Sequence, residues 1–305
     1  MATQRPDPAS TTDAGTSCVT VTFVGVGAIG LPMACRLAAA GFAVTAVDPS
    51  PRTRALAQAV GLRTAPDIPS VSLGDVVLVM VATGSQLLDT IAAATARGPL
   101  TGQTWVIGST VGPEDGRRAA GLLADAGAHV VDAPVLGGVP GAEQGRLRIL
   151  AAGSPAALDR VRDVLRPLGE IAEVGDRPGD GQAVKVVNQL CSSVHLAAAA
   201  EALSLASRLG LDPARIVPIL SGSSGSSWFF EDRGPRMATP PVAEDALTRL
   251  AILAKDNDLV VREAERAGAR APLARAAAGQ YRRAAEMGLL DLDDSQIIRT
   301  YLASQ

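Results

Sequence analysis

The chain has few of the residues that mark several classes of protein. Its three cysteines, Cys18, Cys35 and Cys191, are odd in number and widely spaced, so neither a disulfide framework nor a zinc site is indicated. No basic run occurs and the formal net charge is −3, which argues against nucleic acid as a partner. The longest apolar runs fall well short of the roughly 18 residues that suggest a membrane span. We therefore expect no bound metal, no nucleic acid and no membrane.

Aromatic residues are also scarce, at 3% of the chain, whereas glycine occurs 31 times. This composition favours closely packed backbones over aromatic stacking surfaces. Residues 1–17 hold one arginine and no apolar block, which excludes a secretory signal and indicates a disordered tail. The remaining chain is long enough for two domains, and we expect a cytoplasmic protein.

A strand, a glycine turn and a helix are predicted where the sequence first becomes apolar. The β-branched run VTVTFVG leads directly into GVGAIGLPMACRLAAAG. Gly25, Gly27 and Gly30 have the G-x-G-x-x-G spacing, which gives a tight turn, access for a pyrophosphate and close helix packing. A phosphate would bind at the helix N-terminus, because free amides and the helix dipole favour anions there. We therefore predict a dinucleotide at this turn, with Ala28 and Ile29 among its contacts.

An acidic residue ends the next predicted strand, FAVTAVD. This residue, Asp48, follows Gly30 by 18 residues, close to the spacing found in dinucleotide-binding units. Its carboxylate can accept hydrogen bonds from both ribose hydroxyls and would repel a 2′-phosphate, so NAD is the expected cofactor. Arg52 and Arg54 lie just beyond and could hold such a phosphate, so NADP stays open as the alternative.

Strands and helices continue to alternate as far as residue 178. Further strands are expected at 75–83, 104–110, 129–135 and 147–153. This order predicts an α/β fold, a doubly wound parallel Rossmann sheet over residues 18–178. Ligands of such sheets lie beyond the carboxyl ends of the strands. The predicted cofactor contacts therefore include residues at two strand ends, Val81, Ala82 and Thr83, then Ser109 and Thr110.

One long helix is predicted between Gly179 and Gly210, followed only by further helices, so residues 179–305 should form an all-α domain. Apolar residues recur in steps of three and four and predict one buried stripe along the long helix: Val184, Val187, Cys191, Val194, Ala198, Ala202, Leu205 and Leu209.

A polar stripe lies beside the apolar one and carries Lys185, Asn188, Gln189 and Ser192. A solvated face is the ordinary interpretation of such a stripe. Apolar neighbours on both sides of Lys185, with no acid near it in the helix, favour a functional lysine instead. His195 would lie about 15 Å from Lys185 along the axis, so we interpret it as a packed or capping histidine.

A glycine-rich stretch, DAPVLGGVPGAEQGRL at 132–147, lies between the two predicted domains. Consecutive backbone amides around Gly137 and Gly138 could form a concave site for a carboxylate. A series of ordinary turns would explain the same glycines equally well.

Five blocks together resemble the β-hydroxyacid dehydrogenase family, which includes 3-hydroxyisobutyrate dehydrogenase and tartronate semialdehyde reductase. They are FVGVGAIGLPMACRLAAAGFAVTAVD, GSTVGPE, DAPVLGGVPGAEQGRL, GQAVKVVNQ and LAKDNDLV, in family order from about residue 19 to the C-terminus. Two further blocks, GSSWFFEDRGPRM and DLDDSQIIRTYL, are similar to the L-threonate dehydrogenase branch.

The resemblance implies a role for each matching residue. The family's proton-transfer lysine matches Lys185, and Asn188 matches an asparagine that helps to hold the substrate and would fix the direction of the lysine. Lys255 matches a lysine that contacts the cofactor, and its neighbour Asp256 lines the site. The resemblance also implies cofactor contacts at Thr110, Val81 and Ala82.

Two departures from the family pattern bear on the substrate. Leu136 occupies the place of a serine whose hydroxyl binds substrate, so a donor is lost and bulk is added. An apolar pocket discriminates by only about 1 to 3 kcal/mol per methylene. Gln189 replaces the second asparagine of the family's K-x-x-N-N. The predicted substrate contacts are Leu136, Gly137, Gly138, Asn188 and Asp256.

The resemblance implies an NAD(P)-dependent oxidoreductase of the EC 1.1.1 type for a small hydroxy acid or its oxo or semialdehyde form. It also implies a homodimer or homotetramer paired through the helical domain. An imine reductase of similar architecture and a non-catalytic dinucleotide-binding protein are the alternatives. Burial would have to lower the pKa of Lys185 for it to act as a base near neutral pH.

Overall fold

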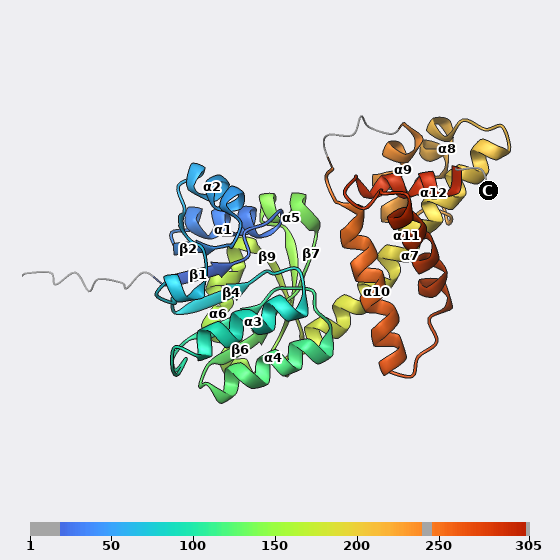
Figure 1. Ribbon diagram of the computed structural model, residues 1–305. Coiled ribbons are helices and arrows are strands. Elements are labelled where there is room, and N and C mark those ends of the chain that lie inside the picture. Colours follow the sequence, from blue (N-terminus) through green and yellow to red (C-terminus); the bar gives the residue numbers. More distant parts are fainter. Residues whose placement is uncertain (1–18, 240–245, 303–305) are drawn as a thin grey trace, which may run out of the picture.

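The computed structural model consists of a sheet domain followed by a helical domain and describes residues 19–239 and 246–302 (Figure 1). The tail predicted at residues 1–17 lies outside the described residues. Helix α7 (Asp180–Arg208) starts against the sheet domain and runs into the helical domain. Its bounds agree with the long helix predicted between Gly179 and Gly210.

The sheet domain carries nine strands in one sheet, in the order β3-β2-β1-β4-β5-β6-β8-β7, with β9 paired to β8. The strands are β1 (Thr20–Val24), β2 (Ala43–Val47), β3 (Arg63–Ala65), β4 (Val76–Val79), β5 (Thr104–Ile107), β6 (His129–Asp132), β7 (Val135–Leu136), β8 (Leu147–Ala152) and β9 (Gly169–Gly175). All pairs from β3 to β6 are parallel, which confirms the predicted Rossmann sheet.

The far edge of the sheet differs from the prediction in one respect. Strand β8 runs antiparallel to β6 and β7 and parallel to β9. Strands β3 and β7 have three and two residues, too few for alternation to show in the sequence. Strand β9 reads GEIAEVG and is only partly buried, so its composition gave no clear strand pattern.

Helices cover both faces of the sheet. Those of the sheet domain are α1 (Gly30–Ala39), α2 (Pro51–Ala59), α3 (Gly84–Thr95), α4 (Pro113–Asp125), α5 (Gly138–Gln144) and α6 (Pro155–Leu165). Side chains of α1, α2, α5 and α6 pack in the core on one face, and those of α3 and α4 in the core on the other. This is the doubly wound arrangement, which leaves the carboxyl ends of the strands free for ligands.

Three helices begin with a side-chain N-cap followed directly by a proline. Ser50, Ser154 and Asp212 each accept a backbone N–H bond at the N-cap of a helix, and a proline follows at once in every case. The side chain satisfies an amide of the first turn, and proline at the first helical position needs no partner for its nitrogen. These helix starts are therefore set by local sequence.

The helical domain surrounds the second half of α7. It consists of α8 (Pro213–Leu220), α9 (Trp228–Ala238), α10 (Leu250–Arg266), α11 (Pro272–Glu286), the short 3-10 helix η3 (Asp294–Ile298) and α12 (Arg299–Leu302). A buried ion pair between Arg233 and Asp294, 3.0 Å apart, ties α9 to η3. The hydroxyl of Tyr281 donates to the carbonyl of Ser193, 3.0 Å away, and ties α11 to α7.

The predicted burial of α7 is wrong. Val187, Leu205 and Leu209, from the apolar stripe, are 66%, 58% and 67% exposed, whereas Lys185 and Gln189, from the polar stripe, are 9% and 6% exposed. The inward face is filled by polar residues at its start and by small and leucine side chains further along. The helix therefore turns its apolar stripe outward.

Length and composition alone would allow α7 to cross a membrane. Core helices of other proteins pass the same test, and 44% of the relevant window is buried inside this molecule. Its polar inward face contacts β6, β8 and α4 of the sheet domain and α10 of the helical domain. These contacts are those of a helix in a protein core.

Candidate functional site

The glycine turn between β1 and α1 is shaped by two of its three glycines. Gly25 has a φ of 87°, and a Cβ there would lie 2.4 Å from the carbonyl oxygen of Met80. A Cβ on Gly30 would lie 2.0 Å from the carbonyl oxygen of Gly25. Gly27 differs, because a Cβ on it would meet no heavy atom within 4 Å. The protein itself does not require glycine at 27, so the open space there fits the approach of a pyrophosphate.

The carboxylate of Asp48 lies beside this turn. Its two oxygens accept hydrogen bonds from the backbone nitrogens of Val26, at 3.1 Å, and Ser50, at 2.9 Å. Arg54 is committed elsewhere: its Nη1 donates to the carbonyls of Asp48 and Pro49, each at 2.8 Å. Of the two arginines weighed for a 2′-phosphate, one is thus held by the backbone. Ala28 is exposed and Ile29 half-buried in the turn itself.

The loop after β4 brings three predicted cofactor contacts to the same edge of the sheet. The backbone nitrogens of Ala82 and Thr83 donate to Oε1 of Gln86, and the Thr83 hydroxyl caps the nitrogen of Gln86 in return. This capping box fixes the start of α3. The backbone nitrogen of Val81 donates to the Ser109 hydroxyl at 2.8 Å, which joins this loop to the loop after β5.

Lys185 lies in the second turn of α7, with its ammonium group inside the protein. Its Nζ donates to the carbonyl oxygen of Val135 at 2.9 Å, next to Leu136. Burial lowers the pKa of Lys185 to about 8; Asp256 opposes that change and Lys255 adds to it. The interpretation of this residue as part of a solvated face is therefore wrong. So is the expectation that Asn188 orients it, because the partner of the lysine is a backbone carbonyl.

Two amides and an ion pair adjoin the lysine. Asn188 Nδ2 donates to Oε1 of Gln189 at 2.8 Å, and Gln189 Nε2 makes a short hydrogen bond to Oδ2 of Asp256. Oδ1 of Asp256 lies 2.8 Å from Nζ of Lys255, although without the alignment of a hydrogen bond. Nζ of Lys255 in turn donates to the carbonyl of Thr110 at 3.3 Å. These contacts bring together five of the residues predicted or considered for the site.

A buried pair that the sequence analysis missed fixes the start of α7. The Gln182 side chain is fully buried: its Nε2 donates to Oδ1 of Asp132 and to the carbonyl of Ser109, both at 2.8 Å. Its Oε1 accepts from the backbone nitrogens of Val111 and Gly112, at 3.0 and 3.1 Å. Gln182 thus uses all its donors and acceptors to join α7 to β6 and to the loop after β5.

Asp132 completes this junction. Its Oδ2 accepts hydrogen bonds from the backbone nitrogens of Gly179 and Gln182, both at 2.9 Å. Burial raises the pKa of Asp132, and the hydrogen bonds from Gln182 and Gly179 offset part of that change. The sequence signal that could have revealed Asp132 is its charge, because it is an acidic residue at the end of a strand on the ligand side of the sheet. Its partner is 50 residues away, so spacing could not reveal the pair.

The remaining predicted substrate contacts lie at β7. Leu136 is the last residue of this strand and is half-buried, and Gly137 and Gly138 follow with φ values of 119° and 60°. Both glycines therefore adopt a backbone that favours glycine. The hydrogen bond from Lys185 to Val135 brings the lysine to this strand, one residue before Leu136.

Contacts connect the glycine turn to the lysine without interruption. Gly25 of the turn packs against Met80, and the backbone nitrogen of the following residue, Val81, donates to the Ser109 hydroxyl. The carbonyl of Ser109 accepts a hydrogen bond from Gln182, and Lys185 lies three residues after Gln182 in α7. His195 is exposed, so the expectation that it is packed is wrong, and it lies outside this set.

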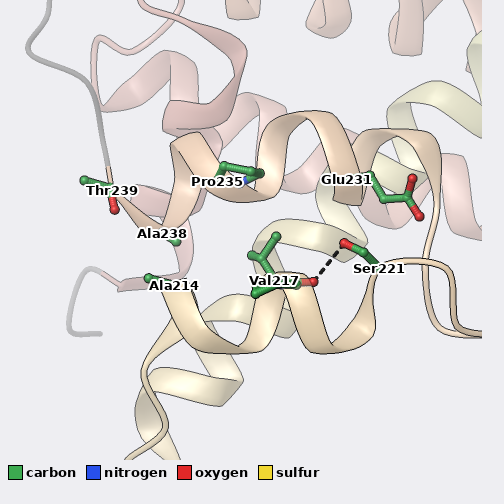
Figure 2. A pocket seen from close by; sticks show the side chains of 8 residues that line it. Ala214, Val217, Ser221, Glu231, Pro235, Ala238 and Thr239 are labelled. Atoms are coloured by element: carbon green, nitrogen blue, oxygen red, sulfur yellow. Dashed lines mark hydrogen bonds between the residues drawn. The ribbon is translucent and has the colours of Figure 1, made fainter.

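A separate pocket of about 380 Å³ lies between α8 and α9 (Figure 2). It is lined by Ala214, Val217, Pro218, Ser221, Glu231, Pro235, Ala238 and Thr239. None of the predicted site residues is among them. Ser221 directly follows α8, and its hydroxyl donates to the carbonyl of Val217 in that helix, as the dashed line in Figure 2 shows.

Three features lie along one edge of the sheet: a glycine turn that leaves room for a phosphate group, an acid beside that turn, and a buried lysine. Together they define an NAD(P)-binding oxidoreductase. Two family models match the chain. The NAD binding domain of 6-phosphogluconate dehydrogenase matches residues 20–176, and the NAD-binding domain of NADP-dependent 3-hydroxyisobutyrate dehydrogenase matches residues 179–301. The chain belongs to the β-hydroxyacid dehydrogenase family.

Individual relatives agree with this assignment. The chain is 34% identical to L-threonate dehydrogenase of Cupriavidus necator, over 91% of this chain and 94% of that one. It is 35% identical to a probable 3-hydroxyisobutyrate dehydrogenase of Mycobacterium tuberculosis, over 93% and 98%. A crystal structure of 3-hydroxyisobutyrate dehydrogenase from Salmonella typhimurium superimposes with a TM-score of 0.84 at 29% identity, over 92% and 99%.

A likeness to imine reductases extends to the fold alone. The imine reductase from Pseudomonas sp. superimposes with a TM-score of 0.59 at 20% identity, over 93% of this chain and 99% of that one.

Proposed function

We propose that the chain catalyses reversible hydride transfer between a nicotinamide cofactor and a small hydroxy acid, with Lys185 as general acid and base. The observation that supports this most strongly is the buried ammonium of Lys185, which donates to the carbonyl of Val135 in β7. The same helix is held through Gln182 to Ser109, which also binds the backbone of Val81 in the loop after β4. Relatives named L-threonate dehydrogenase, 3-hydroxyisobutyrate dehydrogenase and 2-hydroxy-3-oxopropionate reductase support the substrate class.

In this proposal Lys185 moves one proton in each direction. In oxidation, neutral Nζ takes the hydroxyl proton of the carbinol, and in reduction the ammonium returns a proton to the carbonyl oxygen. A pKa of about 8 makes both forms available near neutral pH, which a lysine in water would not. The bound nicotinamide supplies the hydride acceptor or donor.

The residues of the sheet edge fit a dinucleotide. Gly25, Gly27, Ala28, Ile29 and Gly30 would hold the pyrophosphate, and Asp48 would accept from the ribose hydroxyls. Residues at the next two strand ends and one lysine of α10 complete the proposed cofactor contacts: Val81, Ala82, Thr83, Thr110 and Lys255. NAD is the proposed form, because Asp48 would repel a 2′-phosphate and Arg54 is held by two carbonyls.

The substrate would bind between β7 and α7. Leu136, Gly137 and Gly138 would lie on one side of it, and Asn188 and Asp256 on the other. The half-buried Leu136 would give this proposed substrate site an apolar side at the end of the strand. We further propose that residues 18–178 form the cofactor domain and residues 179–305 the substrate and dimerisation domain.

A second copy of the chain would cover the outward face of α7, which carries Val184, Val187, Leu205 and Leu209 at 39 to 67% exposure. Exposed apolar surfaces of this kind mark protein contacts. The proposed assembly is a homodimer or homotetramer, and the proposed location is the cytoplasm.

The experiment follows NADH absorbance with the full chain against L-threonate, D-glycerate, 3-hydroxyisobutyrate and their oxo or semialdehyde forms, with cyclic imines as a second panel. We expect turnover of at least one hydroxy acid. Turnover of imines alone would make the protein an imine reductase. Cofactor binding without any turnover would leave a non-catalytic dinucleotide-binding protein.

A further inference from the structure

We propose that Gln182 is a positioning residue for the reaction, because its one side chain holds both the helix that carries Lys185 and the loop that carries Thr110. The inference rests on the proposed function and adds to it the group that aligns the proton-transfer lysine with the cofactor. Gln182 is fully buried, so it acts through the residues that it binds and not by contact with the substrate.

Two parallel connections join the start of α7 to the end of β6 and the start of β7. Gln182 Nε2 donates to Oδ1 of Asp132 at 2.8 Å, and Lys185 Nζ donates to the carbonyl of Val135 at 2.9 Å. The two donors are three residues apart on the helix, and the two acceptors are three residues apart in the sequence. A shift of the helix that broke the first connection would therefore also move the ammonium relative to Val135.

The start of α7 is also packed closely against the sheet. Oδ2 of Asp132 accepts from the backbone nitrogens of Gly179 and Gln182, both at 2.9 Å. A Cβ on Gly181 would lie 2.4 Å from the carbonyl oxygen of Leu150 and 3.0 Å from Oδ2 of Asp132. The helix therefore begins in direct contact with β6 and β8, with no room for a side chain between them.

The same amide group of Gln182 holds the loop after β5. Its Oε1 accepts from the backbone nitrogens of Val111 and Gly112, and its Nε2 also donates to the carbonyl of Ser109. These bonds lie on both sides of Thr110, the residue of this loop that is proposed to contact the cofactor. The backbone at Thr110 is therefore fixed by the side chain that also fixes the start of α7.

The hydrogen-bond directions allow one arrangement of this junction. Two backbone N–H groups face Oε1 of Gln182, so Nε2 must face Asp132 and the carbonyl of Ser109. Three N–H donors face Asp132, which must therefore accept at both oxygens, as a carboxylate does. A change of either side chain from acid to amide, or from amide to acid, places like groups in contact.

Loss of this alignment should affect turnover more than cofactor binding. A misplacement of reacting groups by about 1 Å can reduce a rate about 100-fold, even when the changed residue lies away from the chemistry. In the part of the chain that the structure describes, no hydrogen bond joins Gln182 to the glycine turn or to Asp48, which would hold most of the dinucleotide. We therefore expect kcat to fall by about 10- to 100-fold and NADH affinity to change by less than about fivefold.

The first test is a double-mutant cycle of Gln182→Glu, Asp132→Asn and both changes together. In Gln182→Glu two carboxylates face each other in a buried site, and in Asp132→Asn a nitrogen faces a nitrogen. The double variant has a donor at 132, an acceptor at 182 and one charge, although the carbonyl of Ser109 loses its donor. Its kcat should therefore lie below that of the wild type and exceed that of both single variants by about threefold or more.

The second test displaces Gln182 without removing any hydrogen-bonding group. A Cβ on Gly116, in α4, would lie 3.1 Å from Cγ of Gln182, whereas a Cβ on Gly121, in the same helix, would meet no heavy atom within 4 Å. Gly116→Ala should reduce kcat by about threefold or more, because the side chain of Gln182 must move. Gly121→Ala is the matched control and should keep the wild-type kcat.

A further control separates alignment from stability. Tyr281→Phe removes a hydrogen bond to the carbonyl of Ser193, a residue of α7 eight positions beyond Lys185. It should lower the melting temperature and keep kcat within about twofold, since no group of the junction changes. Kinetics are measured with L-threonate, or with the hydroxy acid that the wild-type chain turns over fastest, at a temperature where every variant is folded. Fluorescence titration gives the NADH affinity.

Three results would overturn the inference. They are a kcat that Gln182→Glu and Gly116→Ala both leave unchanged, a double variant no faster than the slower single variant, and an equal loss of kcat in Tyr281→Phe and Gln182→Glu. Each can be observed only with an active wild-type chain, so the proposed function stands in all three cases. A wild-type chain that turns over no acid of the panel overturns the proposed function, and this inference with it.

Discussion

The two faces of α7 are opposite in character to those of an ordinary surface helix. The inward face at its start carries Gln182, Lys185 and Gln189, all at most 9% exposed. The outward face carries Val187 and Leu205, at 66% and 58% exposure. Polar side chains can be buried only when their groups are paired, and on this face each has a partner from another strand, loop or helix.

This contrast shows that the two faces of α7 have different partners. Its inward polar groups complete the sheet edge at which the glycine turn lies. Its outward apolar side chains pack against no other element of the described residues and stay exposed. We expect substitutions on the inward face to change stability, substrate choice or pH dependence, and substitutions on the outward face to change assembly.

The largest effect on stability is expected at the junction of the inward face. Gln182→Leu leaves the amides of Val111 and Gly112 and one oxygen of Asp132 without partners in a buried site. Unpaired buried groups cost about 1 to 3 kcal/mol each. The melting temperature should fall by about 10 °C, at roughly 2 to 4 °C per kcal/mol. Thermal unfolding followed by circular dichroism measures this.

Gln58→Leu is the matched control, because Gln58 is exposed and donates only to the Thr64 hydroxyl. It should shift the melting temperature by no more than about 2 °C, in line with other surface changes. If both substitutions lowered the melting temperature equally, the buried hydrogen bonds of Gln182 would contribute no more to stability than a surface contact does.

The outward face is tested by assembly rather than by melting. Val187→Glu and Leu205→Glu place charges on the exposed stripe, so they should convert the proposed oligomer to monomers. Leu56→Glu, at an exposed position of α2, should leave the assembly intact. Sedimentation velocity gives the mass of each species. A monomeric wild-type chain, or charged variants that assemble normally, would show that this face has another role.

The smallest expected effect is a shift of the pH profile. Asp256 raises and Lys255 lowers the pKa of Lys185. Asp256→Asn should therefore move the acidic limb of kcat/KM for oxidation to lower pH, and Lys255→Met should move it to higher pH. Limbs that move in the same direction in both variants would contradict this account of the lysine.

Much of the cofactor half of the site could be predicted from the sequence because it is local. Gly25, Gly27 and Gly30 are within six positions of one another, and Asp48 ends the next strand. Their tasks depend on the strand, turn and helix that contain them. Most strands of the sheet, including β8, were predictable for the same reason. The antiparallel direction of β8 was not, since strand direction depends on partners far away in the sequence.

The inward face of α7 could not be read in the same way. A hydrophobic pattern predicts which side of a helix avoids water but not whether another domain or another chain provides the cover. The Gln182–Asp132 pair joins residues 50 positions apart, so no local pattern reveals it. Lys185 was singled out by its apolar neighbours and its role by the family motif, whereas its partner Val135 was found only through the structure.

The central claim is that Lys185 transfers the proton. Its pKa of about 8 lies below the ordinary 10.5, so between these values the unfolded chain binds more protons and the free energy of unfolding rises with pH. Below pH 8 the folded protein bears the full cost of the buried charge, about 3 kcal/mol at 1.36 kcal/mol per pKa unit. Lys185→Met removes that cost.

The most direct measurement is therefore steady-state kinetics of Lys185→Met at pH 7, with NADH binding and melting temperature followed on the same samples. We predict that kcat/KM falls by about 10³-fold or more, that NADH binds nearly as in the wild type, and that the melting temperature does not fall. Retention of activity within tenfold of the wild type would contradict the claim.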